Sequence, residues 1–177
     1  YQLTPDVAHS GGSVWNVNQI DLNNPFSYNF EVWLGCSDWG ADGIAFVLQP
    51  VNINQGGASS SLGYGGITPS LVVELDTWPN DVTMMDPVED HIAIMMNGES
   101  NHATANNLAG PVVASSTQNN IEDCQWHTIR VLWDPGLSTL AVFFDGMFRT
   151  SYTGDIINTI FGGNSSVYWG WTGGTGS

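Results

Sequence analysis

The sequence predicts an all-β protein in which antiparallel strands form a sandwich. Short runs rich in Val, Ile, Phe, Tyr and Trp alternate with turn residues along the whole chain, which is the pattern of a β-sandwich. No segment has a heptad repeat or three turns of amphipathic helix. The chain has 177 residues, 42% of them hydrophobic, so it is long enough for one domain with a sizeable core.

The expected strands are runs of β-forming residues bounded by turn residues. In chain order they are Ser13–Asn18, Ser27–Leu34, Gly43–Leu48, Leu71–Asp76, His91–Met96, His127–Trp133, Thr139–Phe144, Met147–Tyr152 and Val167–Thr172.

The segments between these runs predict turns and loops. Asp145-Gly146 predicts a tight hairpin turn, and Asp134-Pro135-Gly136 predicts a turn before the strand that follows. The Gly- and Ser-rich segment Gln55–Gly66 and the Asn-, Ala- and Ser-rich segment Gly98–Ile121 predict surface loops. No internal repeat or domain boundary interrupts the pattern, so residues 1–177 are expected to form a single domain.

The charge and composition indicate which kinds of molecule this protein is not expected to bind and where it is expected to be found. With 17 acidic residues, two basic ones and a net charge of −15, the surface repels phosphate backbones and anionic lipids, which argues against nucleic-acid and membrane-surface binding. No apolar run reaches the ~18 residues that would insert into a membrane. Few charged residues and eight Trp favour a secreted or cell-surface β protein. The ending WGWTGGTGS follows directly on a strand and leaves a sheet edge to cover, so we expect a module of a longer protein.

The cysteines, the other histidines and the tryptophans are expected to have structural roles. Cys36 and Cys124 could form a disulfide or remain two buried thiols, and the extracellular composition favours the disulfide. His9, His102 and His127 have no partner pattern in the sequence. Six tryptophans are expected in the core by default: Trp15, Trp33, Trp39, Trp133, Trp169 and Trp171.

The most informative segment runs from Leu71 to Ile94. In a strand, Glu74 and Asp76 point to the same face, and the segment contains no Lys or Arg. Adjacent carboxylates repel unless a proton or a cation lies between them. Carboxylate oxygens suit calcium, and a histidine beside carboxylates suits an ion such as manganese. A two-metal site is therefore the first hypothesis, and a solvated acidic loop is the alternative. The potential ligands are Glu74, Asp76, Asn80, Asp86 and His91.

Three motifs in order then resemble those of the L-type (legume-type) lectin family. They are ADGIAFVLQP, then SLGYGG, then VELDTWPN followed by DP and DH, and the resemblance extends from about Ser13 to Gly176. It is nearest to the bacterial lectin-like modules of large secreted surface adhesins. The resemblance implies a concanavalin-like antiparallel β-sandwich (jelly roll), a role in cell adhesion, a carbohydrate or glycan partner, and further domains of a parent adhesin.

The resemblance also implies two ions, Ca²⁺ and a second divalent ion such as Mn²⁺. Their implied ligands are Asp76 and Asp86 for both ions, Asn80 and the carbonyl of Trp78 for calcium, and Glu74 and His91 for the second ion.

The implied sugar site lies beside the calcium. The carboxylate of Asp42 would accept hydrogen bonds from two sugar hydroxyls, after a cis peptide bond at Ala41-Asp42. An aromatic ring would stack on the sugar, and an amide and a main-chain N–H would donate to it. A C-terminal loop over Thr172–Gly176 would tune the specificity. The implied sugar-binding residues are Asp42, Ser60, Trp78, Asn80, Thr172 and Gly173.

The same sandwich also occurs in glycoside hydrolases, so the fold leaves the activity open. Those enzymes need a pair of carboxylates across the scissile bond. In the laminarinase-like group, which this segment partly resembles, the catalytic acids lie on one strand in the pattern Glu-x-Asp-x-x-Glu. Here Glu74 and Asp76 are followed by Thr-Trp-Pro-Asn, without the second Glu. We therefore expect a lectin and no enzyme. A metal-stabilised structural or adhesion module is the main alternative, and a hydrolase is the weaker one.

Overall fold

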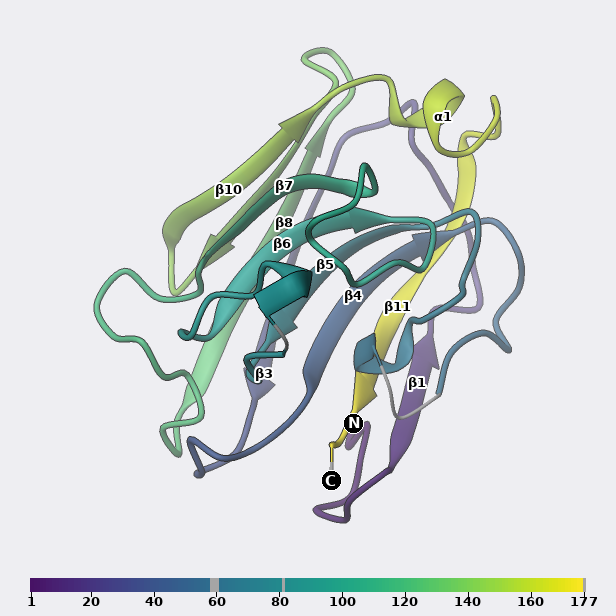
Figure 1. Ribbon diagram of the computed structural model, residues 1–177. Coiled ribbons are helices and arrows are strands. Elements are labelled where there is room, and N and C mark those ends of the chain that lie inside the picture. Colours follow the sequence, from purple (N-terminus) through teal and green to yellow (C-terminus); the bar gives the residue numbers. More distant parts are fainter. Residues whose placement is uncertain (58–60, 81, 177) are drawn as a thin grey trace.

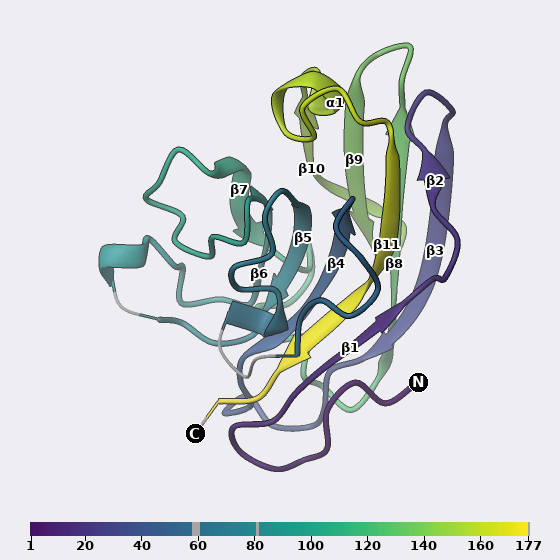
Figure 2. The ribbon, with the colours of Figure 1, turned by 90° about the vertical axis from the view of Figure 1, so that its right-hand side faces the viewer.

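Two antiparallel sheets face each other in the computed structural model, which describes all residues except 58–60, 81 and 177. The seven-stranded sheet has the order β1-β11-β4-β5-β6-β7, with β2 also pairing with β11, and the four-stranded sheet has the order β10-β9-β8-β3. Figure 1 shows the first sheet from the front, and Figure 2 shows the two layers from the side. This arrangement confirms the expected antiparallel β-sandwich.

The strands are β1 (Gly11–Trp15), β2 (Ile20–Asp21), β3 (Phe26–Trp33), β4 (Gly43–Gln49), β5 (Leu71–Asp76), β6 (His91–Met96), β7 (Asn107–Val113), β8 (Trp126–Asp134), β9 (Thr139–Phe144), β10 (Met147–Thr153) and β11 (Ser166–Gly174). The short helix α1 spans Ile156–Thr159, and single 3-10 turns span Ser61–Gly63 and Val82–Met84.

Each strand expected from the sequence is present, with its ends shifted by up to a few residues. The hairpin at Asp145-Gly146 is confirmed: Phe144 pairs with Met147, and both turn residues have positive φ, as a two-residue hairpin turn requires. The sequence missed two strands, β2 and β7. Strand β7 contains Gly110 and Pro111, which weaken a strand pattern and are tolerated at an edge. Among the strands of the described residues it pairs only with β6, through an irregular register, so the predicted loop Gly98–Ile121 is wrong over β7.

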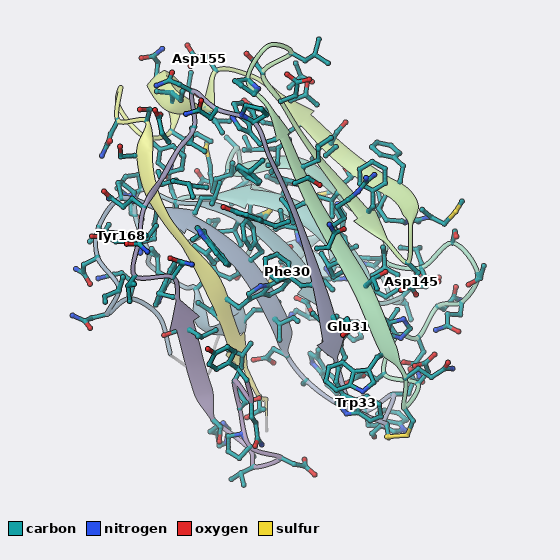
Figure 3. The ribbon with its side chains drawn as sticks, turned by 180° about the vertical axis from the view of Figure 1, so that it is seen from behind. Phe30, Glu31, Trp33, Asp145, Asp155 and Tyr168 are labelled. Atoms are coloured by element: carbon teal, nitrogen blue, oxygen red, sulfur yellow. A yellow bond between two sulfur atoms is a disulfide. The ribbon has the colours of Figure 1, made fainter. Side chains whose placement is uncertain are left out.

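The main core fills the space between the two sheets. Alternate residues of β8, namely Ile129, Val131 and Trp133, are at most 2% exposed, which follows from the period-two alternation of a strand. On β3 the ring of Phe30 lies 5.7 Å from that of Phe46 and 5.1 Å from that of Trp171. Figure 3 shows Phe30 between the layers, seen from behind. Burial of these aromatic and aliphatic side chains holds the two sheets together.

A second, smaller core covers the other face of the seven-stranded sheet. It combines Ala45, Val47, Val72, Ala93 and Met95 from the sheet with Leu62, Tyr64 and Ile67 from the segment that follows the Gly/Ser-rich stretch.

The described part of the predicted Gln55–Gly66 surface loop is thus packed on the sheet. Leu62 and Tyr64 are 2% and 0% exposed. Gly63 has a φ of +76°, and a Cβ there would lie 2.6 Å from the carbonyl oxygen of Gly173, so only glycine permits this close approach. The predicted surface loop thus buries part of its own residues, because the face of the sheet beneath it is apolar and needs cover.

The default expectation of buried tryptophans is wrong for two residues. Trp39 is 83% exposed and Trp33 is 45% exposed, whereas Trp133 and Trp171 are buried. Trp33 lies on the same outward face of β3 as Glu31 (Figure 3), and it contacts Trp126 with ring centroids 5.6 Å apart. The period of the strand, rather than the residue type, decides which face Trp33 occupies.

One disulfide, between Cys36 and Cys124, joins the segment after β3 to the segment before β8. It confirms the pairing that the composition favoured. Within the described residues, no helix has the length and apolarity needed to cross a membrane.

The stability of the fold is expected to depend on pH through His127. Its Nδ1 lies 2.8 Å from Oδ2 of Asp145 and its Nε2 lies 3.0 Å from Oδ1 of Asp123. Burial alone would lower the pKa of His127, but the two carboxylates raise it above the ordinary value. A raised folded-state pKa stabilises the protein fully below the unfolded pKa of about 6.5, and this contribution disappears as the pH rises through the folded pKa.

We therefore expect the melting temperature of the wild type to fall more than that of His127→Gln between about pH 6 and about pH 9. Thermal unfolding of both proteins in one buffer series measures the difference. Equal slopes for the two proteins would contradict the prediction.

Candidate metal centre and carbohydrate-binding site

Strand β5 carries two buried carboxylates into the sheet. Glu74 is 0% exposed and Asp76 is 3% exposed. Glu74 lies between Ala45 of β4 and Ala93 of β6, and these small neighbours leave space above its side chain. A buried carboxylate is unfavourable unless it is neutralised, paired or bound to a metal, so the groups that fill this space decide what the site can do.

Two side chains from distant loops occupy that space. The hydroxyl of Tyr64 donates a hydrogen bond of 2.6 Å to Oε2 of Glu74 and lies 3.1 Å from the carbonyl oxygen of Glu99. The Nε2 atom of His102 contacts Oε1 of Glu74. Both partners are buried, Tyr64 at 0% and His102 at 5% exposure. Both oxygens of Glu74 therefore have a fixed partner.

The same site contains polar atoms without hydrogen bonds. The Nδ1 atom of His102 lies 2.7 Å from Oδ1 of Asp86, but neither atom has a hydrogen bond of acceptable geometry to any described residue. The Nε2 atom of His91 is also buried and unpaired among the described residues. One ligand atom from each of Glu74, His91 and His102 lies within 4.8 Å of the others.

Unpaired buried donors and acceptors are rare in proteins and require an explanation. Two imidazoles and a carboxylate whose ligand atoms lie this close together, some of them unpaired, are a suitable ligand set for a divalent metal ion. The donor set of this site is therefore suited to the second ion that the sequence implies.

Burial and neighbouring charges shift the pKa values of Asp76, His91 and His102 in this centre. Burial, and then the neighbouring Glu74, raise the pKa of Asp76 well above its usual value, and burial lowers that of His91. Burial also opposes the charged form of His102, but Asp86 and Glu74 raise its pKa to about 10. A cationic imidazole or a metal ion thus serves the same electrostatic purpose, which is to neutralise the carboxylates.

The loop after β5 is closed by hydrogen bonds among the residues expected to hold calcium. The backbone N–H of Trp78 donates to Oδ1 of Asp76 at 2.8 Å. The backbone N–H of Asn80 donates to Oδ2 of Asp86 at 3.0 Å, and its amide lies 3.3 Å from the carbonyl oxygen of Trp78. Asn80 is exposed and Trp78 is half-buried. Hydrogen bonds therefore hold four residues together at the end of β5 and in the loop that follows it: Asp76, Trp78, Asn80 and Asp86.

Asp42 lies directly beside this loop. The peptide bond between Ala41 and Asp42 is cis, as expected. The backbone N–H of Thr77 donates to the carbonyl oxygen of Asp42 at 3.0 Å, and the N–H of Asp42 donates to Gly174 at 2.9 Å. Burial raises the pKa of its half-buried carboxyl group. The main chain thus fixes Asp42 between β5 and the end of β11, and no described residue donates a hydrogen bond to its carboxylate.

The C-terminal part of the predicted sugar site requires a correction. Thr172 and Gly173 lie within β11 and are paired with β1 on one side and β4 on the other. Thr172 is 0% exposed, and its hydroxyl donates to the carbonyl oxygen of Leu62 at 2.8 Å. Thr172 ends the strand that the sequence predicts, and this strand continues through Gly173 and Gly174; the expected loop over Thr172–Gly176 is therefore wrong up to Gly174, because both edges of β11 are paired. The segment beside Asp42 is Gly174–Gly176, and Ser60 lies outside the described residues.

Tyr64 and His102 are the site residues that sequence reasoning missed. Tyr64 stands inside the SLGYGG motif, which was a usable signal. His102 lies 28 residues from Glu74 in the segment between β6 and β7. Only the packing of that segment over β5 brings it to the cluster, so no local spacing could indicate it.

The two layers and this site define the class of the protein as a concanavalin-like jelly-roll sandwich with a candidate metal centre at one end of its larger sheet. A family model described as the legume lectin beta-barrel domain matches residues 1–177. The chain therefore belongs to the legume lectin domain family. The family and the fold imply a carbohydrate-binding function.

Solved structures of lectins have the same fold. The basic winged bean lectin with Tn-antigen is 20% identical, with a TM-score of 0.74 over 98% of this chain and 76% of that chain. Lectin II from Ulex europaeus is 20% identical, with a TM-score of 0.71 over 99% and 79%. The exoplasmic/lumenal domain of VIP36, bound to Ca²⁺ and Man3GlcNAc, is 24% identical, with a TM-score of 0.71 over 98% and 72%.

Proposed function

We propose that this protein is a calcium-dependent lectin module that binds glycans at a cell surface. Calcium is held by Asp76, the carbonyl of Trp78, Asn80 and Asp86, and a second divalent ion such as Mn²⁺ by Glu74, Asp76, Asp86 and His91. Sugar hydroxyls bind Asp42 and Asn80, with Trp78 beside them. The module is secreted, and it belongs to a longer surface adhesin.

One observation carries the proposal. The carboxylate of Asp42 has no donor among the described residues, and the backbone of Asp42 is hydrogen-bonded to Thr77, the residue between Asp76 and Trp78. A free acceptor is therefore fixed directly beside the loop expected to hold calcium. When bound, the ion would neutralise Asp76 and Asp86 and fix the position of this loop. The side chains of the chain itself would supply the hydrogen bonds to the sugar.

The burial of the carboxylates argues against hydrolysis. A glycosidase needs two carboxyl groups that reach the scissile bond. Glu74 is 0% exposed, and its oxygens are held by Tyr64 and His102. We infer that the β5 carboxylates bind ions and do not perform acid–base chemistry.

A structural module without sugar binding is the second candidate. It is favoured by the burial of Thr172 and Gly173 in the sheet, because this reduces the number of groups offered to a ligand.

A glycan array with and without a calcium chelator separates the candidates. We expect binding to a restricted set of glycans that disappears with the chelator and returns with excess Ca²⁺. We also expect the melting temperature to rise with Ca²⁺, by an amount corresponding to about 2.7 kcal/mol at a concentration 100 times the Kd. A calcium-dependent melting temperature without glycan binding would support the structural module. Release of reducing sugar from a β-glucan would contradict the absence of catalysis.

A further inference from the structure

The side chain of His102 has no role in the proposed function, although it contacts two carboxylates of the metal centre. It is 5% exposed and lies against Glu74 through Nε2 and against Asp86 through Nδ1. Its ring also meets that of His91 edge to face, with centroids 5.1 Å apart. A surface histidine with a merely incidental contact would not be buried among three ionisable side chains.

The two ring nitrogens of His102 are not equivalent. Nε2 has a hydrogen-bond partner in Oε1 of Glu74, whereas Nδ1 has none among the described residues, despite its short distance to Asp86. A histidine that binds a metal through one nitrogen usually donates its other N–H to a carboxylate or a carbonyl. His91 has the same arrangement, since its Nδ1 lies 3.3 Å from the carbonyl oxygen of Glu89 and its Nε2 is unpaired.

We propose that His102 is a ligand of the inner ion through Nδ1, so that this centre holds a transition ion with two imidazoles, those of His91 and His102, together with carboxylate oxygens. The inference rests on the metal centre of the proposed function and specifies its ion. Imidazole nitrogen suits Zn²⁺, Co²⁺ and Ni²⁺, whereas a centre dominated by carboxylates suits Mn²⁺. The second imidazole therefore makes the centre selective for an ion of the zinc type over manganese.

Glu74, which is itself a proposed ligand of this ion, also positions His102. Its Oε1 atom fixes the imidazole through Nε2, and Tyr64 fixes the other oxygen. Such supporting partners orient a histidine ligand, and their loss costs about 10–100-fold in metal affinity. The buried contacts leave the ring of His102 little freedom to turn, so its Nδ1 atom stays directed toward Oδ1 of Asp86, with the ring of His91 beside it.

The test compares Zn²⁺ and Mn²⁺ binding by calorimetry to chelator-stripped protein that has been reloaded with Ca²⁺. Zn²⁺ binds more tightly than Mn²⁺ to most sites of nitrogen and oxygen ligands, so the expected result is that the preference of the wild type for Zn²⁺ over Mn²⁺ becomes smaller in His102→Gln. His102→Gln should lose at least the roughly 10–100-fold of Zn²⁺ affinity that follows the loss of a mere supporting partner, and change its Mn²⁺ affinity less. His127→Gln is the matched control, because His127 also lies between two carboxylates; it should bind both ions as the wild type does.

A measurement on the wild type keeps the proposal testable if His102→Gln does not fold. The chain has four histidines, so long-range proton–nitrogen NMR spectra of their rings are simple to assign. Zn²⁺ should shift Nδ1 of His102 and Nε2 of His91, and leave His9 and His127 unchanged.

Three results would overturn the inference: a Zn²⁺ shift at His91 alone, unchanged Zn²⁺ affinity in His102→Gln, or no Zn²⁺ binding at all. In the last case the imidazolium of His102 would itself neutralise Glu74 and Asp86. Calcium-dependent glycan binding observed alongside any of these results would leave the proposed function intact. Zn²⁺ binding through His102 without any glycan binding would support this inference and contradict the proposed lectin function.

Discussion

Replacing Asp86 by Ala is expected to abolish the response to calcium and to lower the melting temperature. The substitution removes the oxygen that accepts the backbone N–H of Asn80 and the carboxylate that contacts His102. Glu74 and Asp76 then lose the ion that they share with Asp86. Loss of bound calcium costs about 2.7 kcal/mol at 100 times the Kd, and a buried group left unpaired costs about 1–3 kcal/mol.

For a domain of this size, each kcal/mol corresponds to about 2–4 °C, so we expect the melting temperature in Ca²⁺ to fall by at least about 7–15 °C. Differential scanning calorimetry with and without chelator measures this change. Asp86→Asn tests the charge at nearly constant shape. Glu31→Ala, an exposed position on the outer face of β3 (Figure 3), is the control for loss of one negative charge. A wild type that melts identically with and without chelator would refute the prediction.

Replacing Asp42 by Ala is expected to remove sugar binding with little loss of stability. Both main-chain hydrogen bonds of Asp42, from Thr77 and to Gly174, remain available to alanine. The carboxylate itself accepts no hydrogen bond from the described residues, and its partial burial raises its pKa. A sugar would lose two charge-assisted hydrogen bonds, worth about 1.5–3 kcal/mol each, which corresponds to a fall of at least about 100-fold in affinity.

Isothermal titration with a glycan identified on the array measures this loss. Asp38→Ala is the matched control, because Asp38 is an exposed carboxylate four residues earlier on the same loop. The Asp42 variant should retain the calcium-dependent melting temperature that the Asp86 variant loses. Glycan affinity close to that of the wild type in Asp42→Ala would exclude Asp42 from the sugar site.

Local pattern was sufficient for the parts of the fold that depend on neighbouring residues. Runs of β-forming residues between turn residues indicated β8 and β9, and Asp145-Gly146 indicated the hairpin from β9 to β10, because φ and ψ are set within a few residues. The same reasoning failed for β7, where Gly110 and Pro111 conceal an edge strand. It also failed for Trp33 and Trp39, because burial depends on which surface the second sheet covers.

The candidate site also has some features that the local sequence predicted and others that it did not. Glu74 and Asp76 could be assigned to one face of one strand from their spacing alone, and the need for a counter-charge followed from their proximity. The full extent of β11 could not be inferred: the expected strand ended at Thr172, but Gly173 and Gly174 also belong to the sheet because both edges of β11 are paired. Pairing of this kind joins residues far apart in the chain, which a local pattern does not encode.

The sequence by itself determined an antiparallel β protein of marked negative charge, with carboxylates placed on β5 and in the loop after it, because strand alternation and like-charge repulsion operate between near neighbours. Only the tertiary structure decided what neutralises and supports those carboxylates. It placed Tyr64 and His102 on Glu74 and fixed Asp42 beside Thr77. These contacts form because loops must cover the second apolar face of the seven-stranded sheet, and that covering brings together residues whose separation in sequence carries no signal.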